Sequence, residues 1–238
     1  MKIAIISDIH GNLEALSALT ESYDELWVLG DLVNYGPDPG AVIDFVRSNA
    51  TVVVRGNHDD AVGFNRDPRC SALYRAMAKE TMDFTLSVLS ADQRTYLTGL
   101  PLVVSRTVDD TTFVLCHAAP SDSLYKYVPA NSPEWEREME GIDTDLLLVG
   151  HTHTPFVQTV GGSLVVNPGS LGQPKTGSAK ACYAIWDRGV VLRAIDYELD
   201  RTLRKIDMMP VSTEVKEDLK AVLRSGGLAT ASASLVQR

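Results

Sequence analysis

The sequence predicts an α/β protein built around a sheet whose strands are covered on both faces. Short apolar runs recur along the chain, and each run is continuous rather than alternating with polar residues. Continuous runs indicate strands buried on both faces, whereas a half-exposed strand alternates. In the segments between the first three runs, apolar residues recur at helical spacing. The runs that carry this prediction are 3–6, 26–29, 52–54, 113–116 and 146–149.

Two helices are expected between the first three strands. Leucines recur at helical spacing over 13–19, and apolar residues do the same over 42–46. The second helix has a clear start, because Asp38 is a residue type that caps free amides and Pro39 is pre-set for the first helical position.

The alternation of strand and helix stops after Asp60, and a helical insertion is expected at about 61–100. One helix is predicted over 73–89, and a shorter one begins after the capping box at 90–93. The insertion either completes the core or forms a lid over a substrate. Inserted helices usually just pack, which favours the first interpretation.

Three further strands are expected toward the end of the chain, at 164–166, 182–186 and 190–195. The residues 187–189, Asp-Arg-Gly, suit a hairpin loop between the last two. The segment 225–238 has too little apolar surface to offset its ordering entropy, so we expect a flexible tail there. Neither a repeat nor a linker divides the rest, and a single domain is predicted over 1–224.

Composition and charge narrow the class of protein. Of 238 residues, 45% are hydrophobic and 22% are charged, which excludes disordered, collagen-like and coiled-coil chains. A net charge of −9 repels a polyphosphate backbone, so bulk nucleic-acid binding is disfavoured. The first apolar run is too short for a signal peptide or a spanning helix. We therefore expect a cytoplasmic protein without a membrane partner.

The cysteines predict no disulfide framework. Cys70, Cys116 and Cys182 are odd in number and widely spaced, and they form no CxxC metal site. Cys116 lies within a predicted strand, and nothing around it indicates a stabilised thiolate, so it is interpreted as a core residue rather than a nucleophile.

Side chains that bind metals follow each of the first five predicted strands. The carboxyl ends of strands in an open α/β sheet meet at one crevice, so these side chains are expected to converge. A lone histidine after a strand is more often a loop residue, but a full set at equivalent strand ends predicts a metal centre. Imidazoles, carboxylates and an amide suit Mn, Fe, Zn or Ni. The set comprises Asp8, His10, Asp31, Asn57, His58, His117, His151 and His153.

These residues form sequence blocks that resemble the signature of the calcineurin-like metallophosphoesterases. The blocks run in family order within residues 1 to about 175, as Asp8-Ile9-His10, Gly30-Asp31, Gly56-Asn57-His58-Asp59, His117 and Gly150-His151-Thr152-His153. The segments 35–39 and 167–170 are similar to the small, single-domain YfcE-like branch. The resemblance implies a four-layer α-β-β-α sandwich of two packed mixed sheets, with a binuclear metal centre at its rim.

The resemblance also implies the metal ligands. Asp8, His10 and His153 would hold one ion, Asn57, His117 and His151 the other, and Asp31 would bridge them. The cofactors would be two divalent ions, with Mn favoured over Fe, Zn or Ni. Two cations about 4 Å apart can lower the pKa of a shared water and neutralise charge on phosphoryl oxygens.

His58 is implied to face the substrate rather than a metal. Its implied role is that of a general acid, because an alcohol leaving group needs a proton. Asp59 either orients the His58 ring or caps the following helix, and the sequence leaves both interpretations open.

The reaction implied is hydrolysis of a phosphoester, and one departure favours diesters. Phosphatases of this superfamily carry an Asp-Arg pair after the Gly-Asp block, and the arginine grips a monoester dianion. This chain has Asn34-Tyr35 instead, which favours a phosphodiesterase on small or nucleotide phosphoesters. A phosphomonoesterase is the alternative, and a metal-poor binding module is a further one. Arg55 matches another arginine of the phosphatase motif and either contacts phosphate or is a solvent-facing strand end.

Other residues are expected near the crevice. Tyr35, Phe64, Tyr125 and Tyr127 either stack on a base or pack. The turn at 167–170 either offers amides to a phosphate or has no ligand role, and Lys175 is an alternative cation. The predicted substrate-binding residues are Tyr35, Arg55, Asn57 and His58. Helical insertions often supply a two-fold interface, so a homo-oligomer is also considered.

Overall fold

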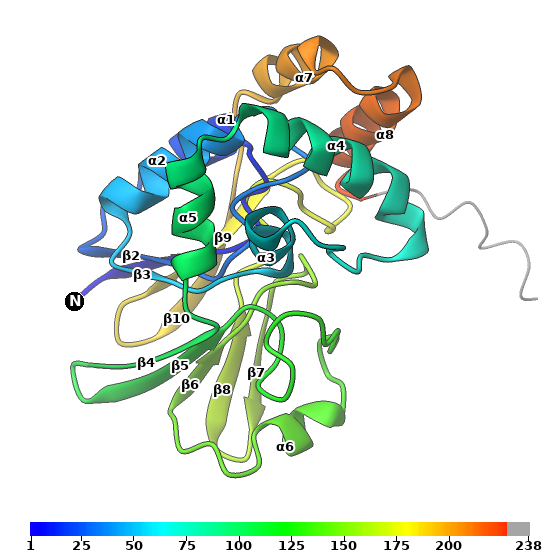
Figure 1. Cartoon of the computed structure of the whole chain (residues 1–238). Helices are drawn as coiled ribbons and strands as arrows, with labels where there is room; N and C mark the ends of the chain where they lie inside the picture. Colours follow the sequence, from blue (N-terminus) through cyan, green and yellow to red (C-terminus); the bar gives the residue numbers. More distant parts are fainter. Residues whose placement is uncertain (228–238) are drawn as a thin grey trace, which may run out of the picture.

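The computed structural model describes residues 1–227, which form two packed sheets with helices outside them (Figure 1). The first sheet contains β1 (Ile3–Ile6), β2 (Glu25–Val28), β3 (Val52–Val53), β9 (Ala181–Trp186) and β10 (Val190–Ile195), in the order β10-β9-β1-β2-β3. The second contains β4 (Val103–Val108), β5 (Thr111–Cys116), β6 (Leu146–Leu148), β7 (Phe156–Val160) and β8 (Ser163–Asn167), in the order β4-β5-β6-β8-β7.

Both sheets are mixed. In the first, β1 is parallel to β2 and antiparallel to β9, which forms the predicted hairpin with β10. In the second, β6 is parallel to both β5 and β8, while β4 and β7 run antiparallel at the edges. The parallel strands place the residues that follow them at a common edge of the molecule.

Large apolar side chains fill the space between the sheets. Ile3 and Ile5 of β1 are fully buried there. The Phe113 ring of β5 packs edge-on against Trp27 and against Trp186, with ring centroids 5.0 and 5.1 Å apart. Each such side chain contributes about 1.5–3 kcal/mol when fully buried, so this layer holds the two sheets together.

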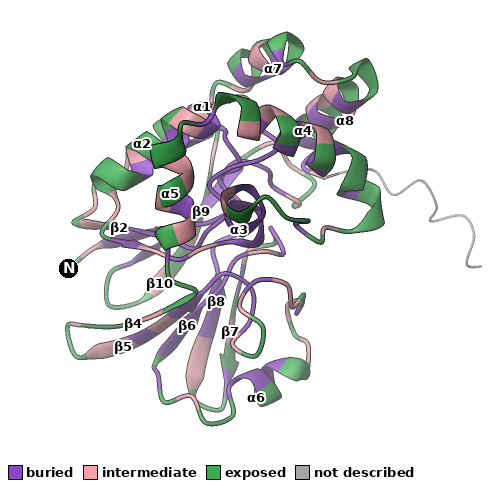
Figure 2. Ribbon diagram, viewed as in Figure 1, coloured by how far each residue is buried: buried purple, intermediate pink, exposed green. Residues whose placement is uncertain are grey.

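Helices cover the outer faces of both sheets. The first sheet is covered by α1 (Leu13–Ser17), α2 (Pro39–Asn49), α3 (Asn57–Phe64) and α5 (Ala91–Gly99). The second carries α6 (Glu134–Glu138), whose Trp135 packs near Phe156 of β7. Figure 2 shows buried strands between helices with exposed outer faces. The predicted α-β-β-α sandwich is confirmed.

A second helical group, the helical cap, lies beside the carboxyl ends of β1 and β2. It consists of η1 (Ala72–Tyr74), α4 (Arg75–Val88), α7 (Leu199–Met208) and α8 (Thr213–Ser225). These helices share one apolar cluster, which contains Met77 of α4 and Leu219 and Val222 of α8, and Tyr35 joins it from the loop after β2. Part of the predicted insertion therefore packs on helices from the end of the chain.

Several local predictions differ from the structure. The strands β4 and β7 and the helices α6, α7 and α8 were not predicted. Asp38 stands at the N-cap of α2, but its carboxylate accepts a hydrogen bond from Lys205 Nζ, at 2.7 Å, rather than from the helix amides. Of the predicted tail at 225–238, residues 228–238 lie outside the described part.

The two cysteines that lie in strands are core residues. Cys116 and Cys182 are buried, and burial raises the pKa of the Cys116 thiol to about 12. Cys116 is thus a core residue, as predicted. Within residues 1–227, no helix has the length and apolar character that crossing a membrane requires.

Candidate metal centre

The predicted ligands converge at one edge of the sandwich. They follow β1, β2, β3, β5 and β6, and they form two groups whose ligand atoms lie within 4.8 Å of one another. Asp8, His10 and His153 make the first group, and Asp31, His117 and His151 make the second. The residues sit together although they come from distant parts of the chain, as the strand-end argument predicts.

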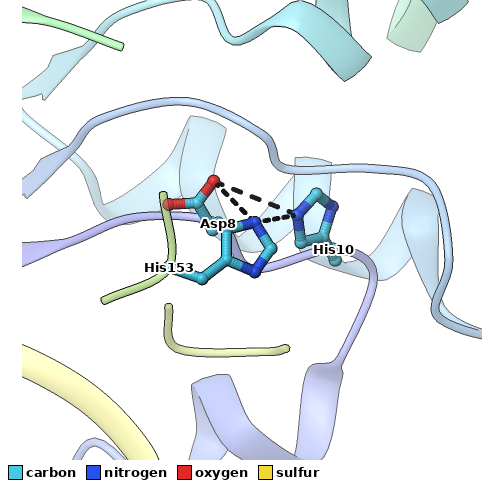
Figure 3. A group of neighbouring side chains, drawn as sticks. All are labelled: Asp8, His10 and His153. Carbon is cyan, nitrogen blue, oxygen red and sulfur yellow. Dashed lines mark hydrogen bonds and ion pairs between the residues drawn. The ribbon is translucent and has the colours of Figure 1, made fainter. Parts of the chain in front are cut away.

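The first group presents three ligand atoms to a common point (Figure 3). His10 Nε2 lies 3.2 Å from His153 Nε2. Asp8 Oδ1 lies 3.3 Å from His153 Nε2 and 3.9 Å from His10 Nε2. All three side chains are buried.

The second group is completed by an amide. Asn57 Oδ1 lies 3.1 Å from His117 Nε2 and 3.1 Å from His151 Nδ1. The Asn57 amide is oriented by Nδ2, which donates to Pro68 O at 2.8 Å and so turns Oδ1 toward the histidines. Asn57 therefore lies where the sequence prediction places a ligand.

Asp31 lies between the two groups. Its Oδ2 is 3.3 Å from His117 Nε2 and 3.8 Å from His10 Nε2, while its Oδ1 accepts a hydrogen bond from the His58 amide at 2.8 Å. A carboxylate within reach of both histidines suits a bridging position between two cations.

Backbone carbonyls fix the tautomers of three ligand histidines. The Nδ1 atoms of His10, His117 and His153 face Val33 O at 3.1 Å, Leu29 O at 2.7 Å and Gln173 O at 2.6 Å. A carbonyl only accepts, so each Nδ1 carries a proton and, in the neutral ring, each Nε2 directs a lone pair inward. Outer contacts of this kind orient imidazoles for metal binding.

This arrangement fits a cation and is unfavourable without one. In the first group two imidazole lone pairs and a carboxylate oxygen face one another, and all three are acceptors. Asp8 Oδ1 is buried without a hydrogen-bond donor among residues 1–227. Facing acceptors repel, and buried polar atoms without partners are costly. Borderline divalent ions accept this combination of nitrogen and oxygen ligands.

The pKa values reflect the same crowding of acceptors. Burial opposes a charged His117, yet the neighbouring Asp31 carboxylate outweighs it and raises the pKa to about 9. Burial lowers the pKa of His10 to about 3, and burial together with the charge of His117 lowers that of His151 to about 3. Near neutral pH His117 thus keeps a proton on the side that faces Asp31, and a bound cation would have to displace that proton.

Five ligands have left-handed backbone conformations. Asp8, His10, Asp31, His151 and His153 all have φ between 48° and 63°. Residues other than glycine adopt this region at a cost of order 1–3 kcal/mol each, and such strain clusters at functional sites. The strand ends are therefore held in costly conformations that aim these side chains inward.

His58 lies beside the metal groups, and its partner is Asn34. The amide of Asn34 is oriented by its backbone contacts: Nδ2 donates to Ala78 O at 3.2 Å, and Oδ1 accepts from Tyr35 N at 3.1 Å. Nδ2 is therefore the atom that meets His58 Nδ1 at 2.8 Å, and it donates there. His58 Nδ1 must accept, so the ring proton lies on Nε2.

Asp59 supports the backbone rather than His58. Its Oδ1 accepts from Leu32 N at 2.8 Å, and its Oδ2 accepts from Asp31 N at 2.8 Å and from Gly56 N at 3.0 Å. Of the two interpretations of Asp59, these contacts support the capping one. The expectation that Asp59 orients the His58 ring is wrong in this structure, because Asn34 holds the ring and the Asp59 oxygens are engaged elsewhere.

A cavity of about 530 Å³ opens over the two metal groups. This volume lies in the range of pockets that bind small molecules. His58 and Tyr35 line it, as do Tyr125, Tyr127 and Lys175. Residues that the sequence did not single out also line it, namely Arg69, Tyr74 and Gln173. The aromatic side chains of the expected crevice are therefore present, apart from Phe64.

Two predicted contacts are absent from this cavity. Arg55 donates to Thr98 O at 2.7 Å, lies 3.3 Å from Asp60 Oδ1 and stacks over the Phe64 ring at 5.1 Å. It does not line the cavity, so its contacts are structural and it is not placed to bind a phosphate there. Phe64 is occupied by the same stacking.

The turn at 167–170 supports the strand ends. Asn167 Nδ2 donates to Gly150 O at 2.6 Å, and Ser170 Oγ donates to Asp8 O at 2.7 Å. Both residues are fully buried. These contacts support the interpretation in which the turn binds no ligand. The turn instead braces the loops that carry Asp8 and His151.

Comparison with known proteins agrees with the ligand geometry. The calcineurin-like phosphoesterase superfamily domain matches residues 1–188. A crystal structure of a metallophosphoesterase from Sphaerobacter thermophilus is 28% identical and has a TM-score of 0.77, covering 93% of this chain and 98% of its own.

Two relatives align with most of this chain. An uncharacterised protein of Methanocaldococcus jannaschii is 28% identical over 239 residues, which cover 86% of this chain and 91% of its own length. The phosphodiesterase YfcE of Escherichia coli is 26% identical over 211 residues, which cover 80% of this chain and 90% of its own length. With its ligand groups and a family match over 188 residues, this chain belongs to the calcineurin-like phosphoesterase superfamily.

Proposed function

We propose that this protein hydrolyses small phosphodiesters, nucleotide diesters among them, with two divalent metal ions, Mn foremost. The observation that carries the proposal is the pair of facing acceptor groups joined at Asp31. The E. coli relative is named a phosphodiesterase, which supports the same class of substrate. Asp8, His10 and His153 would hold one ion, and Asn57, His117 and His151 the other.

When bound, such ions supply Lewis-acid stabilisation of phosphoryl oxygens and activation of a water nucleophile. The chain itself contributes rigid positioning. Its ligands sit on strand ends braced by backbone carbonyls and by the buried turn at 167–170. Groups fixed in this way need little reorganisation during the reaction.

His58 is the proposed catalytic residue that contacts the substrate. It lines the cavity, and Asn34 leaves its proton on Nε2. A neutral imidazole donates a hydrogen bond well, but complete loss of its proton would leave an imidazolate. The geometry therefore favours a donor to a phosphoryl or leaving-group oxygen over the general acid that the sequence implied.

The proposed preference for diesters follows from positions 35 and 55, neither of which offers a free arginine to the cavity. Tyr35, which is buried, stands where phosphatases of the superfamily have an arginine, and Arg55 is engaged with Thr98 and Asp60. A monoester dianion would thus lack a bidentate arginine partner there, whereas a diester carries a single negative charge.

The test is a paired assay on the Mn-loaded protein. Hydrolysis of bis-p-nitrophenyl phosphate is compared with that of p-nitrophenyl phosphate, and metal content is measured on the same sample. We expect about two ions per chain and a clear preference for the diester. Asp31→Asn should abolish activity, whereas Asp24→Asn, on the surface loop before β2, should not. Activity that is unchanged in Asp31→Asn would overturn the proposal, and a preference for the monoester would overturn the diester assignment.

A further inference from the structure

Lys175 is a cation on the cavity wall without an acidic partner. It lines the cavity over the metal groups, and no carboxylate among residues 1–227 lies within ion-pair distance of its Nζ. Its ammonium sits 4.8 Å from the centroid of the Tyr74 ring. A ring face offsets only part of the cost of removing an ammonium from water, so a bound anion would stabilise this side chain.

Arg69 provides a second cation on the same cavity. It belongs to the segment between α3 and η1, and its guanidinium lies 4.5 Å from the centroid of the Tyr125 ring. It likewise has no carboxylate within ion-pair distance among the described residues. Some other cations of the described chain are paired, for example Lys205 with Glu14 and Asp38, and what sets Lys175 and Arg69 apart is their place on the cavity over the metal groups.

The loop that carries Lys175 is held in place at both ends. Lys175 N donates to His153 O at 3.4 Å, which ties the loop to a metal ligand. Two residues later, Gly177 N donates to Gly226 O at 3.0 Å, which ties it to the end of α8. Because its loop is fixed beside the metal centre, Lys175 has a defined place relative to a bound phosphate.

We propose that Lys175 and Arg69 form a subsite for a second phosphate, so that the preferred substrates are nucleoside diphosphate derivatives rather than simple diesters. This inference rests on the proposed function, since it assigns the scissile phosphate to the metal centre. Residues of both metal groups and the two cations line this one cavity. Tyr127 lines the same cavity and is exposed, so its ring is accessible to a nucleoside.

The test measures binding, so that it does not depend on turnover. Titration calorimetry on the Mn-loaded protein compares AMP with the non-hydrolysable α,β-methylene-ADP. We expect the wild-type protein to bind the diphosphate at least about tenfold more tightly, because a charge-assisted contact to phosphate is worth about that much. Lys175→Met should bring the two affinities to within about twofold, and Lys175→Arg should keep most of the preference.

The control is Lys180→Met, which removes a surface lysine that pairs with Asp196 and lies off the cavity. It should leave the preference unchanged. Thermal melting shows whether Lys175→Met is folded, and Arg69→Met provides a second variant for the same preference. If neither variant reduces the preference, or if the wild-type protein has none, the subsite is overturned. Failure to cleave bis-p-nitrophenyl phosphate would instead overturn the proposed function, and it would not affect the measured binding preference for the diphosphate.

Discussion

Asn34 determines the chemical form of His58. Its amide cannot be reversed without losing the contacts to Ala78 O and Tyr35 N, and Thr81 Oγ1 also donates to its Oδ1 at 2.6 Å. An aspartate at this position would instead accept a hydrogen bond from a protonated His58 Nδ1. With an amide at residue 34, His58 stays neutral and can only donate a hydrogen bond through Nε2. With a carboxylate there, His58 would be able to carry a positive charge and give up a proton.

The tautomer of His58 can be observed directly. The ¹⁵N shifts of the imidazole should show a proton on Nε2 in the wild-type protein, because Nδ1 accepts from Asn34. In Asn34→Asp the proton should move to Nδ1 or the ring should become charged, since a carboxylate only accepts. Asn49→Asp, on the exposed surface of α2, is the matched control and should change nothing. An Nδ1–H tautomer in the wild-type protein would refute the assignment.

The role of His58 predicts how its removal affects different leaving groups. If Nε2–H donates a hydrogen bond to a phosphoryl oxygen, His58→Ala should lose about 10²-fold in kcat for both nitrophenyl and alkyl esters. A general acid would lose activity mainly on the alkyl esters, whose leaving groups need a proton. Steady-state kinetics on a matched pair of diesters decides between the two.

His117 predicts a pH dependence in the metal-free protein. Its pKa of about 9 in the folded state lies above the ordinary 6.5, so its stabilising contribution is complete below pH 6.5 and is lost as the pH rises through about 9. The loss is on the order of 3 kcal/mol. Urea unfolding of chelator-treated protein measures it, and His117→Gln should lack this component. An equal decline in both proteins would contradict the prediction.

For single residues, the sequence predicted the metal ligands well but predicted poorly the residues that hold the site in place. Asp8, His10, Asp31 and the later histidines could be predicted because each follows a strand in a fixed pattern. The role of Asn34 could not be predicted, because it depends on Ala78 and Thr81 of α4, a helix whose position no local pattern encodes. The same holds for Asp59, whose partners became known only with the fold.

Among the elements, those with local signals were predicted well. The start of α5 has the predicted capping box, in which Ser90 Oγ accepts from Gln93 N and Gln93 Oε1 accepts from Ser90 N. The strand β4 was missed because it is an edge strand with mostly exposed residues, so it has no apolar run. Asp38 was expected to cap α2, but the distant Lys205 takes its carboxylate.

The end of α8 is an element whose geometry requires glycine. Gly226 has φ +67°, and a Cβ there would lie 2.3 Å from the backbone of Ser178. Gly226→Ala should therefore cost about 1–3 kcal/mol more than φ strain alone. Gly161→Ala, with φ +59° and open space, carries only the strain of about 1 kcal/mol and is the control. Urea unfolding compares the stability of the two variants. Equal losses of stability would contradict the close approach of Gly226 at the end of α8 to Ser178 in the loop that follows Lys175.

For the whole molecule, stability should depend on metal. A bound cation would offset the repulsion between the facing acceptors, and binding to the folded state alone stabilises it by about 2.7 kcal/mol at a free metal concentration 100 times Kd. At this size the shift in Tm is roughly 5–10 °C. Differential scanning fluorimetry with Mn and with a chelator measures it. Asp31→Asn should lose most of the shift, and a shift of equal size in that variant would refute the bridging role.

The overall architecture was predictable from the sequence because it rests on buried strands and family blocks. The helical cap was not, because its helices α7 and α8 pack on α4 through contacts between segments far apart in the chain. The cavity wall was equally hard to predict. Arg69 precedes the helical cap and Tyr74 belongs to its helix η1, and neither was singled out, whereas Lys175 was noted only as an alternative cation.

The position of Gly226 also has a consequence for the order in which the site is completed during synthesis. Every proposed metal ligand has been translated once His153 has been added, and the family domain ends at residue 188. The wall of the cavity nevertheless includes Gly226 and Gly227, and Gly226 O also accepts a hydrogen bond from the Lys175 loop. The residues that would hold the metals are therefore translated well before Gly226 and Gly227, so during synthesis the ligand set precedes part of the cavity wall.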